Sequence, residues 1–249
     1  MLFRSAVLTV AAGADLTDLE VYRRPRVAIL GTGDELAEPG TARDIDAAIP
    51  ESVTFGVLGL AKAWGGEVVS RRRAPDDMAM LEHAARQALA AAEVVVVTGG
   101  ASVGEKDFAR QAFAFAEPEP VFSKVAIKPG KPAWLSRTAD GKLILGLPGN
   151  PTSALVTGRL FLAPLLTGLG GDDPTLAHAW RELPLAEPLP ATGDRETFVR
   201  ARLTEEGLAS LDNQDSGAQS PLAQTGVLIR REAGAAEAAA GEWVQALGF

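Results

Sequence analysis

Three apolar runs, each followed by a glycine-rich turn, constrain the fold of this chain more than any other feature. They occupy residues 26–30, 94–97 and 143–145. Residues 94–97 are consecutive valines, which is typical of a parallel strand that helices cover on both faces. Helical patterns alternate with these runs, as at residues 51–64, where apolar side chains recur at i, i+4, i+7 and i+8. The sequence therefore predicts an α/β fold class, with a mostly parallel sheet and helices on both faces.

The other elements are expected to continue this alternation of strand and helix. Gly65-Gly66 ends the first helix, and a second strand follows at residues 67–71. Asp76 and Asp77 begin the next helix, because negative charge is favourable at the positive end of a helix dipole. We also expect a helix at 108–116, strands near 121–127, 133–137 and 142–146, and a helix at 150–169 with Pro151 in its first turn.

A change of pattern near residues 170–174 indicates a domain boundary. Short alternating runs such as 197–203 and 227–230 follow it, and they predict a small β-barrel-like domain. The apolar stretch near the start is interpreted as the remnant of an upstream domain or a linker, with a signal peptide as the alternative. The predicted organisation is therefore residues 1–20, an α/β domain at 21–173 and a C-terminal β domain at 174–249.

The charge balance and the cysteine count exclude several classes of protein. The chain has 24 Lys and Arg against 32 Asp and Glu, a net charge of −8, so we expect no general nucleic-acid binding, which needs a basic face. It has no cysteine, which excludes disulfides, thiolate zinc sites and cysteine nucleophiles and is consistent with a cytoplasmic location. No apolar run approaches the length of a membrane span, so we expect no membrane partner.

Charged residues beside the glycine-rich turns predict a ligand site. Ligands of open α/β sheets bind at the carboxyl ends of the strands, and glycine lets a backbone approach a phosphate or oxyanion closely. Carboxylates suit Mg²⁺, and lysines suit phosphate. The residues concerned are Gly31, Thr32, Gly33, Asp34 and Glu35; Gly99, Gly100, Ser102, Gly104 and Asp107; Pro148, Asn150 and Pro151; and Lys124, Lys128 and Lys131. We expect a phosphorylated or oxyanionic ligand together with a metal.

Each of these residues also has a structural interpretation. Asp76, Asp77 and Asp107 are placed where they could cap helices. Gly31 and Gly33 could simply make a tight turn, and the spaced lysines could form a solvated face. The tryptophans are interpreted as core residues, and the basic run at 71–73 is expected to be solvated.

The order and spacing of the motifs resemble those of the molybdopterin molybdenumtransferase (MoeA) family, which includes the C-terminal part of gephyrin. The resemblance runs from about Asp18 to Phe249. It rests on Gly31–Leu36 with Pro39-Gly40, residues 99–104 with Asp107, residues 128–132, residues 147–151, and the tail segments 195–200 and 216–223.

The resemblance implies an enzyme that inserts molybdenum from molybdate into molybdopterin, which arrives adenylylated, while Mg²⁺ helps to release the nucleotide. It implies catalytic roles for Glu35, Asp76, Asp107 and Lys128, metal ligation by Glu35, Asp77 and Asp107, and substrate contacts from the remaining turn residues and lysines. It also implies a homodimer or a partner chain that completes the cleft, and contact with an adenylyltransferase of the same pathway.

Two departures from the family pattern leave alternatives open. Family members carry two further domains before this point. The family also has Asn where Val53 follows Glu51-Ser52 here, and Val53 cannot make the hydrogen bonds of Asn. A non-catalytic molybdopterin-binding or scaffold protein of the same family is therefore one alternative. Another is a nucleotide pyrophosphatase of the competence-damage (CinA) type, against which the predicted C-terminal β domain argues.

Overall fold

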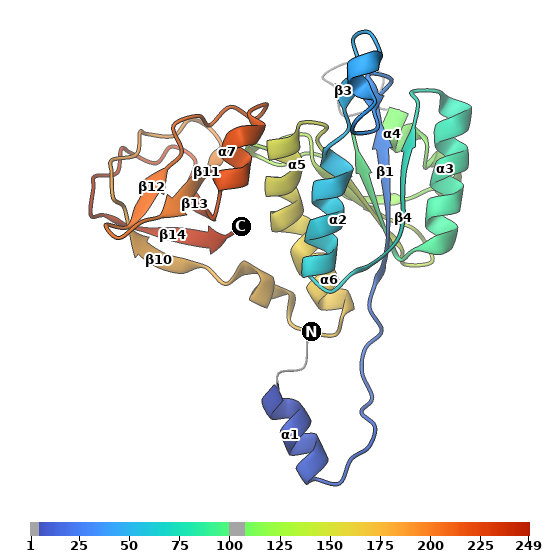
Figure 1. The fold of residues 1–249 in the computed structure, drawn as a ribbon, viewed down its shortest axis with the longest axis horizontal. Coiled ribbons are helices and arrows are strands. Elements are labelled where there is room, and N and C mark those ends of the chain that lie inside the picture. The colour runs from blue at the N-terminus through green and yellow to red at the C-terminus, as the bar shows by residue number, and fades with distance from the viewer. Residues whose placement is uncertain (1–4, 100–107) are drawn as a thin grey trace.

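The computed structural model describes residues 5–99 and 108–249, and it has an α/β domain joined to a β domain (Figure 1). Within the described residues, the sheet of the α/β domain has the strand order β4-β1-β5-β9-β8-β6. The strands β4, β1, β5 and β9 are parallel, and β8 and β6 are antiparallel additions at one edge. Their bounds are β1 Arg26–Thr32, β4 Glu67–Ala74, β5 Val94–Thr98, β6 Glu119–Phe122, β8 Trp134–Arg137 and β9 Leu143–Leu147.

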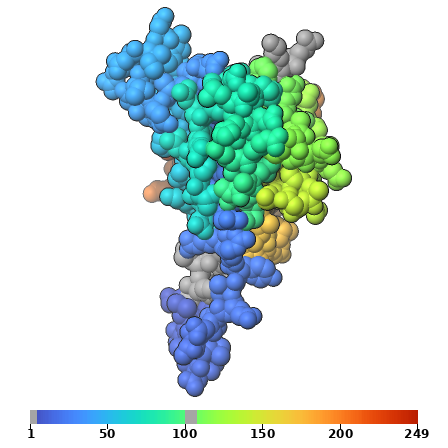
Figure 2. Space-filling model, turned by 90° about the vertical axis from the view of Figure 1, so that its right-hand side faces the viewer, coloured from blue at the N-terminus to red at the C-terminus, as the bar shows by residue number. Residues whose placement is uncertain are grey.

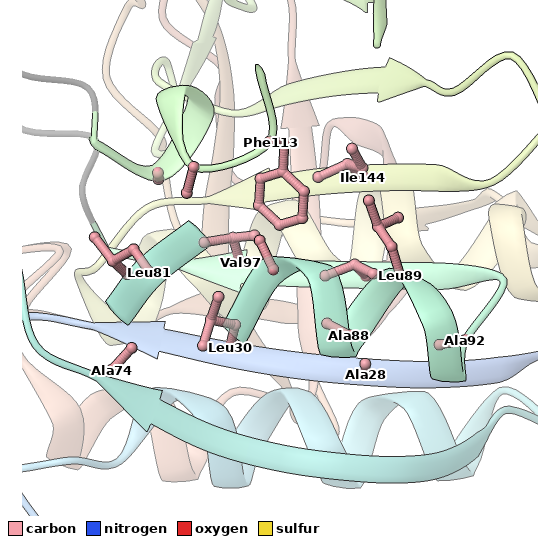
Figure 3. Packing of buried hydrophobic residues seen from close by; sticks show 14 of the residues in the cluster. Ala28, Leu30, Ala74, Leu81, Ala88, Leu89, Ala92, Val97, Phe113 and Ile144 are labelled. Carbon is pink, nitrogen blue, oxygen red and sulfur yellow. The ribbon is translucent and has the colours of Figure 1, made fainter. Parts of the chain in front are cut away.

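Helices cover both faces of this sheet, as the valine run predicts. Val95 and Val97 face a core that contains Leu81 of α3 (Met78–Ala91) and Phe113, which follows α4 (Phe108–Gln111) (Figure 3). The alternate valines, 94 and 96, face α2 (Val53–Ala63), α5 (Pro151–Thr157) and α6 (Ala163–Leu169). All four valines of β5 are fully buried. The predicted α/β class is confirmed.

Local signals set where these helices begin and end. The Asp77 side chain accepts a hydrogen bond from the Met80 N–H at 2.9 Å and caps α3. Gly65 follows α2 in a left-handed conformation, with φ of +85°. The predicted helix at 150–169 begins at Pro151, but a π-helical segment, η3 (Gly158–Leu162), separates α5 from α6.

This helical stretch is also the one candidate membrane span that residues 5–99 and 108–249 contain. Pro151–Leu169 is long and apolar enough to cross a bilayer, judged by length and composition alone. However, 61% of its most apolar stretch is buried inside the structure. The core helix of a globular domain has the same composition, and this one packs between the sheet and the β domain.

The C-terminal part is the small antiparallel β domain that the sequence predicts. Its strand order is β10-β14-β13-β11-β12 among the described residues. The bounds are β10 Arg181–Pro184, β11 Glu196–Leu203, β12 Leu208–Ser210, β13 Val227–Arg231 and β14 Trp243–Gly248, with a short helix α7 at Gln219–Gln224. Leu185, Leu208 and Ile229 form the centre of its core. A strand from the preceding domain, β7 (Ile127–Lys128), pairs in parallel with β11.

The two domains share a buried contact. Ile127, Val156 and Leu160 from the α/β domain pack in one cluster with Phe198 and Leu228 from the β domain. Because an apolar cluster of this kind excludes water from both partners, it contributes to the stability of both domains.

Several local predictions are wrong. The helix expected at 108–116 is the short α4 followed by a 3₁₀ turn η2 (Ala114–Ala116), and the strand expected at 121–127 is divided between β6 and β7. Trp134 is 3% exposed, but Trp243 is 65% exposed and is not a core residue.

Two segments project from opposite ends of the molecule. Residues 5–13 form a helix, α1 (Ser5–Gly13), with no buried residue, and it extends away from the body at one end (Figures 1 and 2). At the other end lies the loop that contains β2 (Leu36–Ala37), the 3₁₀ turn η1 (Ala42–Asp44) and β3 (Ile49–Pro50). A last 3₁₀ turn, η4 (Pro174–His178), begins the connection to the β domain.

Candidate functional site

The glycine-rich turns lie together because the strands before them end at the same level. Gly31 of β1 pairs with Thr98 of β5, and Thr98 pairs with Leu147 of β9. On the other side of β1, Thr32 pairs with Ala74, the last residue of β4. The turns after these parallel strands therefore meet at the carboxyl edge of the sheet, where ligands of open α/β folds bind.

Glycine is required where the backbones of these turns touch. A Cβ atom on Gly99, which has φ of +91°, would lie 2.3 Å from the Thr32 carbonyl oxygen. A Cβ atom on Gly149 would lie 3.2 Å from the Gly99 Cα. Gly31 has a packing reason as well, since its Cβ would lie 3.0 Å from Thr54 Cγ2. The tight-turn interpretation and a ligand-binding role are thus compatible at these positions.

Carboxylates crowd the β1 and β4 side of this edge. Asp34 and Glu35 are exposed, and Asp34 Oδ1 accepts a hydrogen bond from the Asp76 N–H at 2.9 Å. Asp76 Oδ1 is buried and has no hydrogen-bond partner among the described residues. Burial, and then the charges of Asp34 and Glu35, raise the pKa of Asp76. A cation bound beside these groups would relieve their repulsion.

The described residues contain no complete set of metal ligands, but the carboxylates of Asp34 and Asp76 suit a magnesium ion. No group of three or more His, Cys, Asp or Glu side chains in residues 5–99 and 108–249 is arranged to hold a metal. Mg²⁺ is usually bound by one or two carboxylates together with water and substrate phosphates. The unpartnered oxygen of Asp76 beside Asp34 suits that mode. Asp77 caps α3, and its role as a metal ligand stays a prediction.

The lysine segment lies at the same edge of the sheet, on the far side. β8 is antiparallel to β9 with Trp134 opposite Gly146, so the residues before β8 lie beside the carboxyl end of β9. The Val125 N–H bonds to the Lys131 carbonyl at 3.1 Å and closes the loop. A Cβ atom on Gly130 would lie 2.2 Å from Thr157 Cγ2, so the loop packs on α5. Lys124, Lys128 and Lys131 are exposed.

A loop of the β domain also reaches this edge, which the sequence reasoning missed as part of the site. The Asn150 side chain makes no cap hydrogen bond at the start of α5, and its Oδ1 is buried with no partner in the described chain. Gly217 lies beside it, since a Cβ on Gly217 would be 3.9 Å from Asn150 Nδ2. Thr152 Oγ1 donates to the Ala218 carbonyl at 3.3 Å. The sequence signal that could have indicated this contact is the tail segment 216–223, which contains Gly217 and Ala218.

Pro148 is buried, and Pro151 is the first residue of α5. The other residues predicted for the second turn, Gly100, Ser102, Gly104 and Asp107, lie outside the described residues.

The loop after the first turn is anchored by Glu51, not by the residue at position 53. Glu51 is 1% exposed and accepts hydrogen bonds from the Thr54 N–H at 2.8 Å and Oγ1 at 2.5 Å. Arg71 pairs with Glu51 at 3.2 Å and lies 3.9 Å from the centre of the Phe55 ring. The prediction that the basic run at 71–73 is solvated is therefore wrong for Arg71. Val53 is buried in the core beneath α2.

Comparisons with known proteins agree with this architecture. Residues 28–168 match the family model described as "Probable molybdopterin binding domain", and residues 182–249 match the one described as "MoeA C-terminal region (domain IV)". The fold and these matches define the class: an α/β domain of the molybdopterin-binding type with an attached domain IV.

Curated relatives match most of the length of this chain. The chain is 32% identical over 241 residues to molybdopterin molybdenumtransferase of Nostoc sp., a match that covers 90% of this chain and 53% of the relative. It is 34% identical over 207 residues to molybdopterin molybdenumtransferase 2 of Mycobacterium tuberculosis, which covers 81% of this chain and 50% of the relative.

The fold resembles the crystal structure of the molybdopterin biosynthesis MoeA protein from Pyrococcus horikoshii, with a TM-score of 0.83 at 23% identity, covering 100% of this chain and 60% of the other. The chain belongs to the MoeA family. It spans about half the length of the curated relatives that it matches.

Proposed function

We propose that this chain binds adenylylated molybdopterin at the carboxyl edge of its parallel sheet and takes part in inserting molybdenum, supplied as molybdate, into that pterin. The observation that carries the proposal is the convergence of the turns after β1, β5 and β9, which touch at Gly99. A backbone without side chains at this point lets an anionic ligand come close to its N–H groups. The name of the relatives, molybdopterin molybdenumtransferase, supplies the reaction.

The distribution of charge along the edge supports a ligand that lies across several strands. Asp34, Glu35 and Asp76 lie beside β1 and β4, whereas Lys131 lies shortly before β8 and Lys128 lies in β7, which pairs with β11. In the strand order, β1 and β8 are separated by β5 and β9, which is about 14 Å at the usual strand spacing. A phosphorylated pterin of that length would place its anionic groups beside the lysines.

The acidic side suits Mg²⁺, which we propose is held by Asp76 with Asp34 and Glu35, and with Asp107 from the second turn. When bound there, Mg²⁺ would neutralise negative charge on the phosphate that leaves with the nucleotide. The lysines would hold the phosphates and molybdate, and the turns at Gly31, Gly99 and Gly149 would position the pterin. Positioning of this kind lowers the barrier because two reactants are held in one geometry.

A molybdopterin-binding or scaffold role without insertion activity is the second candidate. The observation that favours it is that residues 28–168 match a family model described by binding, "Probable molybdopterin binding domain", and not by a reaction. In either case we propose a cytoplasmic protein that works as a homodimer or with a partner chain completing the cleft, and that receives its substrate from the adenylyltransferase of the same pathway.

Binding and insertion are tested separately with the polypeptide of residues 1–249. Calorimetry with adenylylated molybdopterin, with and without Mg²⁺, measures binding. Reconstitution of a molybdenum-free apoenzyme at physiological molybdate measures insertion. We expect Mg²⁺-dependent binding, with slow insertion that speeds up when the N-terminal region of a longer relative is added, because an open site cannot exclude water. Binding without insertion in either arm would select the scaffold role, and absence of binding would contradict both.

A further inference from the structure

A cleft between the two domains contains arginines but no acidic residue. Its volume is about 320 Å³, which is within the range of small-molecule sites. It lies between the end of α2, the segment η3 and the strands β10, β13 and β14, and its described lining includes no Asp or Glu although the chain carries a net charge of −8. The lining residues used below are Trp64, Arg159, Arg181, Leu183, Leu203 and Val227.

Arg159 is a buried cation with an unused hydrogen-bond donor. It is 5% exposed, its Nε donates to the Gly248 carbonyl at 2.8 Å, and its guanidinium lies 4.5 Å from the centre of the Trp64 ring. Its Nη1 is buried and has no partner among the described residues. Leaving a charged donor unpaired in a buried place is unfavourable, so such groups are normally paired. Burial lowers the pKa of Arg159 to about 10, so the group stays cationic at neutral pH.

The backbone at Arg159 is also unusual. The residue lies in η3, the π-helical segment between α5 and α6. Single π-helical turns inside α-helices are rare and are frequent at functional sites. The unpaired donor and the π-helical turn are independent observations at the same residue.

We propose that this cleft binds a small apolar monocarboxylate. Arg159 lines the cleft, and its planar guanidinium matches a carboxylate. A ligand carboxylate would pair with it once the side chain turns so that the enclosed Nη1 faces the cleft, while Arg181 at the rim adds positive charge. The apolar body of the ligand would pack against Leu183, Leu203 and Val227. A phosphate group fits less well, because a strongly hydrated dianion would lose water to apolar walls.

This site is separate from the carboxyl edge of the sheet. Trp64 is at the C-terminal end of α2, whereas Thr54, which touches Gly31, is at the N-terminal end. The 11 residues of α2 extend about 16 Å. The proposal therefore does not depend on the pterin function.

The test uses 4-phenylbutyrate as the probe and 4-phenylbutanamide, its neutral counterpart of the same shape, as the comparison. Calorimetry on the polypeptide of residues 1–249 should show the carboxylate binding at least about tenfold more tightly than the amide, because hydrogen bonds to a charged group are stronger than those to a neutral one. Arg159→Met keeps an apolar stem and should reduce carboxylate affinity by about tenfold or more while leaving the amide unaffected.

If Arg159→Met does not fold, a second variant tests whether the cleft binds the carboxylate. Leu203 is 61% exposed at the rim of the cleft, and Leu203→Glu should weaken carboxylate binding by repulsion. Val121 is 58% exposed on β6, away from the cleft, and Val121→Glu is the matched control that should bind like the parent. Equal affinity for the acid and the amide, or parent-like carboxylate affinity in a folded Arg159→Met or Leu203→Glu variant, would overturn the proposal.

Discussion

Gly99 lies so close to Thr32 that a Cβ atom on Gly99 would be 2.3 Å from the Thr32 carbonyl oxygen. Thr32 is the last residue of β1, and Gly99 follows directly after β5, the strand that pairs with β1. Relief of the contact would therefore require the strands to separate. The turns after β1 and β5 can therefore lie in contact only because residue 99 is a glycine.

Gly99→Ala is expected to lower the free energy of unfolding by about 2–4 kcal/mol, through the backbone clash and the φ of +91°, and to abolish pterin binding. Gly141→Ala is the matched control, because Gly141 has φ of +86° with nothing within 4 Å of its Cβ position. It should lose only about 1 kcal/mol, the cost of the conformation alone. Urea unfolding of both variants measures the difference, and equal losses would contradict the clash argument.

Asp76→Asn should stabilise the protein and weaken its ligand binding at the same time. Burial and the charges of Asp34 and Glu35 raise the pKa of Asp76 in the folded state. The ionised form is therefore unfavourable at pH 7, and the free energy of unfolding should increase in the variant. This gain should disappear as the pH falls below the ordinary carboxyl pKa of about 4, where Asp76 is protonated in both states. Urea unfolding at pH 7 and pH 3.5, with calorimetry in Mg²⁺, tests both effects.

Asp77→Asn is the matched control for this change. Asn caps helices as well as Asp does, so the free energy of unfolding should stay the same. A loss of Mg²⁺-dependent pterin binding in this variant would show that Asp77 is a metal ligand in addition to the cap of α3.

Glu93→Gln should destabilise the protein in a pH-dependent way. Hydrogen bonds from Arg26 and Arg23 lower the pKa of Glu93 from 4.5 to about 2. A lowered carboxyl pKa contributes stability above the unfolded pKa and loses it as the pH falls toward the folded pKa. After allowance for solvent screening, the loss at pH 7 should be roughly 1–2 kcal/mol, shrinking below pH 4.5. Glu82→Gln, which breaks an exposed pair with Arg86, should cost less than about 0.5 kcal/mol.

Lys128→Met and Lys131→Met should each weaken pterin binding by about 1.5–3 kcal/mol if these lysines pair with phosphate. The affinity of the parent should also fall as salt is added, because exposed charges are screened. Lys62, exposed in the last turn of α2, provides the control Lys62→Met, with no expected change. Parent-like titrations for both lysine variants would make the segment a solvated face.

The parallel sheet could be predicted because its signals are local. A run of valines indicates a strand covered on both faces, and the glycines after the strands indicate turns. Features that depend on distant contacts could not be predicted. Arg71 lies against Phe55 and Glu51 only because α2 packs beside β4, and no sequence pattern distinguishes it from its exposed neighbours.

The same limit applies to the candidate site. Alignment of the turns follows from parallel strands that end at one edge, so the grouping of Gly31, Gly99 and Gly149 could be foreseen. The contact between Asn150 and Gly217 could not, because it joins two domains. The raised pKa of Asp76 depends likewise on where the loop with Asp34 folds back.

Because β7 pairs with β11, we expect the two domains on either side of the boundary near residue 173 to unfold together and not independently. Arg200 reinforces the connection, since it is 1% exposed and donates hydrogen bonds to Thr152 Oγ1 and to the Asn213 and Asp215 carbonyls. We expect a single calorimetric transition in which the van't Hoff and calorimetric enthalpies agree. A protease cut between residues 173 and 174 should leave two fragments that stay associated in native buffer. The β domain expressed alone should aggregate, because it would expose the β11 backbone at Glu196 and Thr197 and the apolar side chains of Phe198 and Leu228.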